Sequence, residues 1–160
     1  MKRILYAVML VLALTGCKKD EPETKGPEKK SINVEVTVDL SQDALDVADL
    51  QFSYVSDSKG TIAKEPIKSL QFKKTVTIPG NSVDWSCQVE CTQKSSFPEK
   101  ESYELNCNIS YLSYGLMSDG EKIRIEADDC RKEATVKREN LETKISIGTL
   151  NFVTTRHFSF

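Results

Sequence analysis

Apolar side chains alternate with polar ones through much of residues 32–160, and this period of two restricts the possible folds more than any other feature. In the first run, Ile32, Val34, Val36, Val38 and Leu40 are separated by single polar residues. Successive side chains of a strand point to opposite faces, so the run predicts a strand with one buried face. No long helical period follows that could supply the crossover helices of a parallel sheet.

The same alternation recurs along the chain and indicates about eight or nine strands. Turn signals separate the runs at Asp57-Ser58-Lys59-Gly60, Pro79-Gly80-Asn81 and Ser118-Asp119-Gly120. Only Ser41–Asp49 has a helical pattern, with Ser41 as its predicted N-cap. The sequence therefore predicts an all-β fold, an antiparallel β-sandwich of the Ig-like or jelly-roll-like kind, as a single domain over residues 32–160. The strands expected after the first one are 50–54, 70–78, 83–91, 103–111, 123–127, 144–147 and 150–152, with 133–136 as a possible further strand, and the chain ends on Phe158-Ser159-Phe160.

The first sixteen residues have the pattern of a signal peptide. Lys2 and Arg3 precede an uninterrupted apolar stretch from Ile4 to Leu14. A segment of this length is shorter than the ~20 residues that span a bilayer, and its flanking charge is typical of export signals.

The end of this stretch reads Leu14-Thr15-Gly16-Cys17, which resembles the lipobox of bacterial lipoproteins. The resemblance implies cleavage between Gly16 and Cys17 and attachment of lipid to Cys17, so that acyl chains hold the protein on a membrane. The following Lys18-Lys19-Asp20-Glu21 resembles the surface-export signal of Bacteroidetes-type lipoproteins. It implies a place on the outer membrane facing the cell exterior, with a periplasm-facing lipoprotein as the alternative.

Residues 17–31 are predicted to be a lipidated cysteine followed by a disordered charged tether. Residues 18–31 contain no apolar side chain, so they cannot bury surface to offset the entropy of ordering. The whole chain has a net charge of −2, and removal of Lys2 and Arg3 makes the remainder more acidic. This balance argues against a nucleic-acid partner.

Four cysteines remain besides Cys17, and an even number in an exported domain predicts two disulfides. Cys87 and Cys91 share one predicted strand and lie too far apart on it to bond to each other. A hairpin centred near Phe97 favours the pairs Cys87–Cys107 and Cys91–Cys130. A centre near Glu99 would pair Cys91 with Cys107 instead. Zinc ligation by the four thiols is a weaker alternative, and we expect no metal.

No catalytic constellation is evident, and we predict neither catalytic residues nor a cofactor. His157 is the one histidine, and no Gly-x-Ser-x-Gly elbow or Gly-rich phosphate loop is present. Trp85 is expected to be a core residue packed near a disulfide, or else a platform on which a sugar stacks. The apolar parity changes after Tyr111, which predicts a bulge there, and Tyr111 and Tyr114 beside it are candidates for a ligand-binding groove.

These features predict a monomeric, non-catalytic binding or interaction module whose ligand is a glycan or a protein. Two alternatives from other classes stay open. One is a small glycan-active hydrolase that uses two paired carboxylates. The other is a structural or inhibitory accessory subunit of a surface complex.

Overall fold

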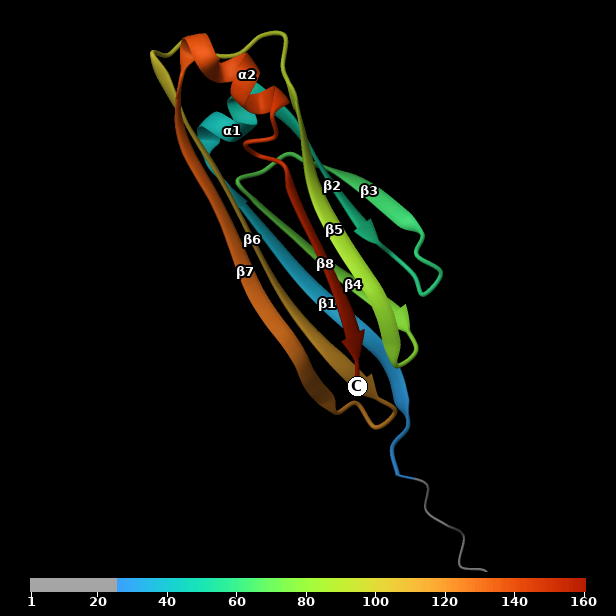
Figure 1. The fold of residues 1–160 in the computed structure, drawn as a ribbon. Helices are drawn as coiled ribbons and strands as arrows, with labels where there is room; N and C mark the ends of the chain where they lie inside the picture. The colour runs from blue at the N-terminus through green and yellow to red at the C-terminus, as the bar shows by residue number, and fades with distance from the viewer. Residues whose placement is uncertain (1–25) are drawn as a thin grey trace, which may run out of the picture.

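The computed structural model describes residues 26–160, which form two four-stranded antiparallel sheets (Figure 1). One sheet has the order β4-β1-β6-β7 and the other the order β3-β2-β5-β8. The antiparallel all-β prediction is therefore confirmed, with eight strands. The proposed lipobox and most of the tether lie outside the described residues. The strands are β1 (Lys29–Leu40), β2 (Ala48–Val55), β3 (Ile62–Ile67), β4 (Gln71–Pro79), β5 (Ser82–Gln93), β6 (Ser102–Met117), β7 (Lys122–Lys137) and β8 (Phe152–Ser159).

The long strands run the length of the domain, whereas β2 and β3 cover only part of it, and most connections lie at two opposite ends (Figure 1). One end carries α1 (Gln42–Val47), the connections 68–70 and 94–101, a short 3-10 turn (Arg138–Asn140) and α2 (Leu141–Ser146). The other end holds the start of β1 and the C-terminus. Backbone hydrogen bonds join these segments: Gly80 N donates to Lys30 O over 3.1 Å, and Phe160 N donates to Asn81 O over 3.1 Å.

The core lies between the two sheets and contains the inward residues of the alternating runs. Its largest fully buried side chains include Trp85, Tyr103, Phe52 and Phe158. Trp85 has no exposed surface, as its expected core position requires, and its indole Nε1 has no hydrogen-bond partner among the described residues. Residues 26–160 include no helix that is both long enough and apolar enough to span a membrane.

The two short helices follow from local sequence signals. The predicted cap of α1 is confirmed, because Ser41 Oγ accepts a hydrogen bond from Ala44 N over 3.3 Å. The strand predicted at 144–147 is wrong, since this segment belongs largely to α2. Leu141 and Ile145 are four residues apart, and both are buried on one side of α2.

Strand β7 differs from its prediction in two respects. The segments 123–127 and 133–136 are parts of one sixteen-residue edge strand. The predicted bulge in β6 is wrong, because β6 pairs with β1 without interruption from Leu116 to Cys107. The irregularity lies on β7 instead: Ser113 pairs with Glu126 while Tyr114 pairs with Arg124, which leaves Ile125 as the extra residue.

The cysteines also differ from the prediction. All four are free in the described residues, so the two predicted disulfides are absent. The assumed Cys87–Cys107 hairpin register is wrong, because β5 and β6 belong to different sheets and the connection 94–101 crosses between them. Burial raises the pKa of Cys87 and of Cys107 to about 12, which keeps both as neutral thiols and unsuited to nucleophilic chemistry.

Candidate functional site

One edge of the domain is closed by a polar cluster that joins the two sheets, here called the Arg156 clamp (Tyr111, Glu126, Asp128 and Arg156). Tyr111 donates its hydroxyl to Glu126 Oε1 over 2.6 Å. Arg156 Nε donates to Tyr111 Oη over 2.9 Å and to Glu126 Oε1 over 3.1 Å. Arg156 Nη2 donates to Asp128 Oδ2 over 2.9 Å. Arg156 therefore bonds from β8 to the facing strands β6 and β7.

The bulge on β7 explains why these side chains converge. Tyr114 points away from the core, and its partner Arg124 shares that outer face. Ser113 points inward, and so does its partner Glu126. In a regular strand Arg124 and Glu126, two residues apart, would point to the same face. The bulge at Ile125 places them on opposite faces. The fully buried Ser113 hydroxyl holds the irregular segment by bonding to both Glu126 N and Glu126 O over 3.1 Å.

The protonation states in the clamp follow from its contacts. Burial, and then the hydrogen bond to Glu126, raise the pKa of Tyr111 to about 12. Hydrogen bonds to Asp128 and Tyr111 raise the pKa of Arg156 above its already high ordinary value. At neutral pH the clamp thus combines a neutral phenol with a permanent cation, and both hold their partners in fixed positions.

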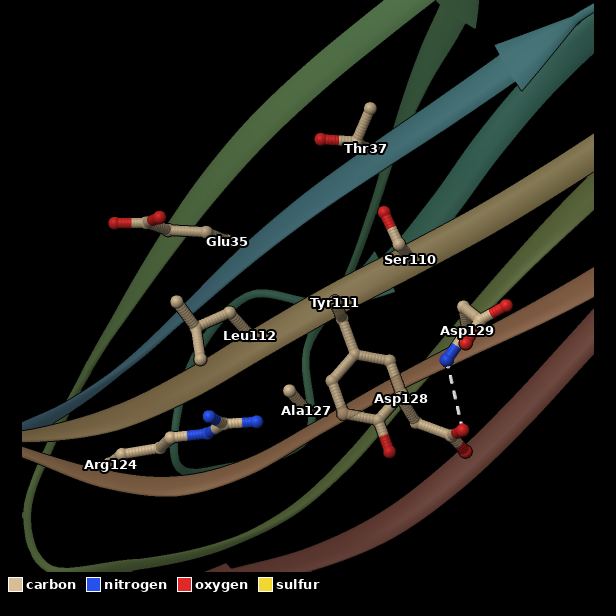
Figure 2. Close-up of a pocket in the computed structure, with 9 residues that line it drawn as sticks. All are labelled: Glu35, Thr37, Ser110, Tyr111, Leu112, Arg124, Ala127, Asp128 and Asp129. Atoms are coloured by element: carbon tan, nitrogen blue, oxygen red, sulfur yellow. Dashed lines mark hydrogen bonds between the residues drawn. The ribbon is translucent and has the colours of Figure 1, made fainter.

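Two hollows border the clamp on the two faces of β7. The outer hollow, of about 520 Å³, lies on the outer face of the β4-β1-β6-β7 sheet (Figure 2). It is lined by Glu35, Thr37, Ser110, Tyr111, Leu112, Arg124, Ala127, Asp128 and Asp129. The inner hollow, of about 300 Å³, is lined by residues of β6, β7 and β8, including Ile109, Cys130, Thr154 and Arg156. Tyr111, Asp128 and Asp129 line both.

The lining of these hollows combines donors, acceptors and small apolar surfaces. Figure 2 shows Leu112 and Ala127 between the polar side chains Glu35, Arg124 and Ser110. The carboxylates only accept hydrogen bonds, the guanidinium only donates them, and the hydroxyls do both. Such a surface suits a ligand that itself offers both donors and acceptors.

The opposite edge of the domain is closed by a related cluster, here called the Lys74 clamp (Tyr54, Glu65 and Lys74). Tyr54 donates its hydroxyl to Glu65 Oε1 over 2.6 Å, and Lys74 Nζ donates to the same oxygen over 2.5 Å. Lys74 Nζ also lies 5.3 Å from the centre of the Tyr54 ring. Lys74 comes from β4, whereas its two partners come from the other sheet.

The structure separates the three aromatic residues singled out in the sequence. Trp85 is buried and presents no face to a ligand. Tyr111 is also buried, but its hydroxyl belongs to the Arg156 clamp. Tyr114 lies on the outer face of β6, where its hydroxyl donates to Glu35 Oε1 over 2.9 Å and Lys122 Nζ sits 4.4 Å from its ring centre.

His157 lies between a serine and an aspartate on the outer face of β5 and β8. Its Nδ1 is 2.7 Å from Asp84 Oδ1, and its Nε2 is 3.4 Å from Ser82 Oγ. This order of groups is that of a nucleophile, a base and an orienting acid. However, His157 is 62% exposed and Asp84 is 87% exposed, and neither lines the two hollows. The arrangement is therefore open to solvent and lies away from both hollows.

The described part of the chain contains neither a buried pair of carboxylates at the clamp nor a cluster of metal ligands. Glu126 and Asp128 share one guanidinium, yet their side chains are 37% and 44% exposed. A general-acid carboxyl of a glycosidase sits in a desolvated pocket, which neither residue has. Within residues 26–160 no group of three or more His, Cys, Asp or Glu side chains is placed to hold a metal ion.

Sequence reasoning identified Tyr111 but missed its partners Glu126, Asp128 and Arg156. The sequence does contain one indication of them. Arg156 is two residues before the apolar Phe158, so a strand through both residues would place the Arg156 charge on the inward face. A charge in that position needs partners from a facing strand. Gly16 and Cys17, the predicted cleavage and lipidation residues, lie outside the described residues.

Comparison with known proteins gives no relative from which a role could be transferred: no family model, no curated protein and no solved structure matches this chain.

Proposed function

We propose that this chain is a lipid-anchored β-sandwich on the outer membrane that acts as a non-catalytic binding module and faces the cell exterior. The anchoring part of the proposal is supported by Leu14-Thr15-Gly16-Cys17 and by the charged, apolar-free residues 18–31. Strand β1 begins at Lys29, close to the predicted end of the tether.

The observation that supports binding most directly is the Arg156 clamp between the two hollows. Its charged and hydroxyl groups are held by one another, so a ligand would meet side chains whose positions are already fixed. The binding region in this proposal is the pair of hollows along β7.

The anchor is tested by comparing the wild-type chain with Cys17→Ser in the cells that produce it. Incorporation of an alkyne-tagged fatty acid into the wild type, and its loss in Cys17→Ser, is the expected result. Protease added to intact cells should degrade the wild-type domain. A chain that incorporates no fatty acid, or resists protease until the cells are broken, contradicts the anchor or the outward orientation respectively.

The binding region is tested with a photo-reactive amino acid, in full-length protein on intact cells. Leu112 in the outer hollow is the test position, and Ile62 on the opposite edge is the matched control, because both are exposed apolar residues on strands. Illumination should attach a ligand at position 112 and not at position 62. Equal attachment at the two positions, or none at 112, contradicts the proposed region whatever the chemical nature of the ligand.

A hydrolase is the second candidate, and the contacts of His157 with Ser82 and Asp84 are the observation that favours it. The test is turnover of a p-nitrophenyl ester by the full-length protein and by Ser82→Ala. Because His157 and Asp84 are open to solvent and lie away from both hollows, we expect the two rates to be the same. A rate that falls at least about a hundredfold in Ser82→Ala would support the hydrolase instead.

A further inference from the structure

We propose that the hollows along β7 bind a neutral saccharide, through a pair of adjacent hydroxyls that contact Arg156 and the neighbouring carboxylates of Asp128 and Asp129. This inference rests on the proposed function, because it assigns a ligand class to the same region.

The charge around the clamp disfavours both kinds of ion. Over the clamp and both hollows, four carboxylates (Glu35, Glu126, Asp128 and Asp129) stand against the two guanidinium groups of Arg124 and Arg156, so the excess of negative charge disfavours an anionic ligand. A cation at Asp128 would have to approach the guanidinium that already binds this carboxylate and Glu126. A neutral ligand meets neither obstacle.

The guanidinium of Arg156 keeps hydrogen-bond donors that its neighbours do not use. A guanidinium has five N–H groups. The Nε–H of Arg156 donates to Tyr111 and Glu126. One N–H of Nη1 donates to Thr155 O over 3.0 Å, and one N–H of Nη2 donates to Asp128. One N–H on each terminal nitrogen therefore stays available within the described contacts.

The neighbouring carboxylates provide the complementary acceptors. Asp128 Oδ1 accepts from Asp129 N over 2.9 Å, and each carboxylate oxygen has a second lone pair (Figure 2). The Asp129 carboxylate accepts no hydrogen bond from the described residues and is exposed. In a vicinal diol, one hydroxyl can accept from the guanidinium while its neighbour donates to a carboxylate. This donor-and-acceptor pairing is what a sugar ring offers along one edge.

The rest of the lining fits the other surfaces of a sugar. Thr154 and Thr155 line the inner hollow, and Thr37 and Ser110 line the outer one, so hydroxyls are present on both faces of β7. Leu112 and Ala127 in the outer hollow give small apolar surfaces that suit sugar C–H groups. The two volumes, of about 300 and 520 Å³, lie in the usual range of small-ligand sites.

A peptide strand added to the free edge of β7 is the competing neutral ligand, and the structure disfavours it. The extra residue Ile125 breaks the even register that a paired strand needs. The edge is also rich in charge, with Asp128, Asp129, Arg131 and Lys132 in one run. Bulges and edge charges are the features by which natural sheets prevent strand addition.

The test is binding of full-length lipoprotein, in detergent micelles, to an array of neutral polysaccharides, uronic-acid polysaccharides and extended peptides. We expect retention on neutral polysaccharides alone. Asp129→Asn should weaken that binding about tenfold, the size expected for a hydrogen bond to a charged group. Because this side chain accepts no bond from the described residues, the substitution should leave the unfolding midpoint unchanged.

Arg156→Met is the second variant and should abolish saccharide binding, while Lys74→Met at the opposite edge is its control and should bind like the wild type. Preference for uronic-acid polysaccharides or for peptides, or equal losses in Asp129→Asn and Lys74→Met, would overturn the saccharide assignment. So would a failure to bind any of the three classes. Such results leave the cross-linking at Leu112 unaffected, so the ligand class and the binding region fail separately.

Discussion

The two edges of the domain are closed by the same kinds of side chain, and comparison of the Arg156 and Lys74 clamps shows how one of them can also serve a ligand. Each clamp takes a tyrosine and a glutamate from one sheet and a cation from the other. The sheets exchange these parts: β2 and β3 supply the tyrosine and glutamate at one edge, β6 and β7 at the other. Each tyrosine also packs on aromatic rings: Tyr54 stacks on Phe52, which in turn packs on Phe72, and Tyr111 packs on Trp85 and Phe158.

The difference lies in the cation and in one additional carboxylate. The ammonium group of Lys74 is a compact charge that serves Glu65 and lies close to the Tyr54 ring. The planar guanidinium of Arg156 binds Glu126 and Asp128 together, which holds a second carboxylate in a fixed position beside the hollows. In the proposed site, the cation that closes this edge would therefore present a donor and an acceptor side by side.

The largest expected effect tests whether both clamps depend on their aromatic support. Trp85→Ala and Phe52→Ala each remove a fully buried ring and should each lower the free energy of unfolding by about 3–5 kcal/mol. Trp85→Phe should cost clearly less, because it keeps a ring and removes an indole N–H that has no partner. Urea unfolding measures all three. A loss in Trp85→Phe as large as in Trp85→Ala would show that the ring is not what supports Tyr111.

Ionisation of the two phenols compares the clamps directly. Burial and a glutamate partner raise the pKa of Tyr54 above 10 and that of Tyr111 to about 12. A raised folded pKa means that the stabilisation is fully present below the unfolded value near 10 and is lost as the pH rises through the folded value. Phenolate absorbance of the wild type minus that of Tyr111→Phe should have its midpoint near pH 12. A midpoint at 10 would place this hydroxyl in solvent.

Removal of each hydroxyl should have a smaller effect. Tyr111→Phe deletes the donor to Glu126 and the acceptor for Arg156, whereas Tyr54→Phe deletes only the donor to Glu65. We expect a loss of about 1–2 kcal/mol for Tyr111→Phe and about 0.5–1.5 kcal/mol for Tyr54→Phe. Chemical denaturation at pH 7 measures both. A larger loss for Tyr54→Phe would reverse the ranking of the two clamps.

The smallest effect is expected for Lys74→Met. A partly exposed ion pair contributes below about 1 kcal/mol at neutral pH. The hydrogen bonds from Lys74 and then Tyr54 lower the pKa of Glu65. The resulting stabilisation is present above the ordinary carboxyl range and is lost as the pH falls through the lowered value. Lys74→Met should therefore flatten the loss of stability below about pH 4.5, measured by denaturation between pH 2 and 7. An unchanged acid profile would contradict the Lys74–Glu65 contact.

Alternation predicts the strands whose inward residues are apolar, and it fails where the inward face is polar. Strand β1 is identified because Val34, Val36 and Val38 all enter the core. The middle of β7, residues 128–132, is missed because its inward positions carry charge, with Asp128 directed at Arg156, so the pattern breaks at the candidate site itself. Strand β3 is missed because Pro66 and its charged neighbours have the composition of a loop, and an edge strand tolerates them.

The alternation of apolar and polar residues does not reveal which strands pair with each other. A polar connection such as 94–101 looks the same whether it joins neighbours in one sheet or crosses to the facing sheet. Which case holds depends on how the whole set of inward faces is shared between two layers. That is why the cysteine register was wrong, and why the contact between Arg156 and β7 could not be derived.

The packing at the C-terminus has a practical consequence for attaching labels to this protein. A Cβ on Gly115 would lie 2.1 Å from the Phe160 ring, and Lys29 donates to the Phe160 carbonyl oxygen, so the last residue fills a space on the end where β1 begins. A fluorophore or epitope added after Phe160 would disturb that end and, with the proposed anchor, would lie against the membrane. The connection 94–101 is at the opposite end (Figure 1), so an epitope inserted there would lie on the end away from the proposed anchor.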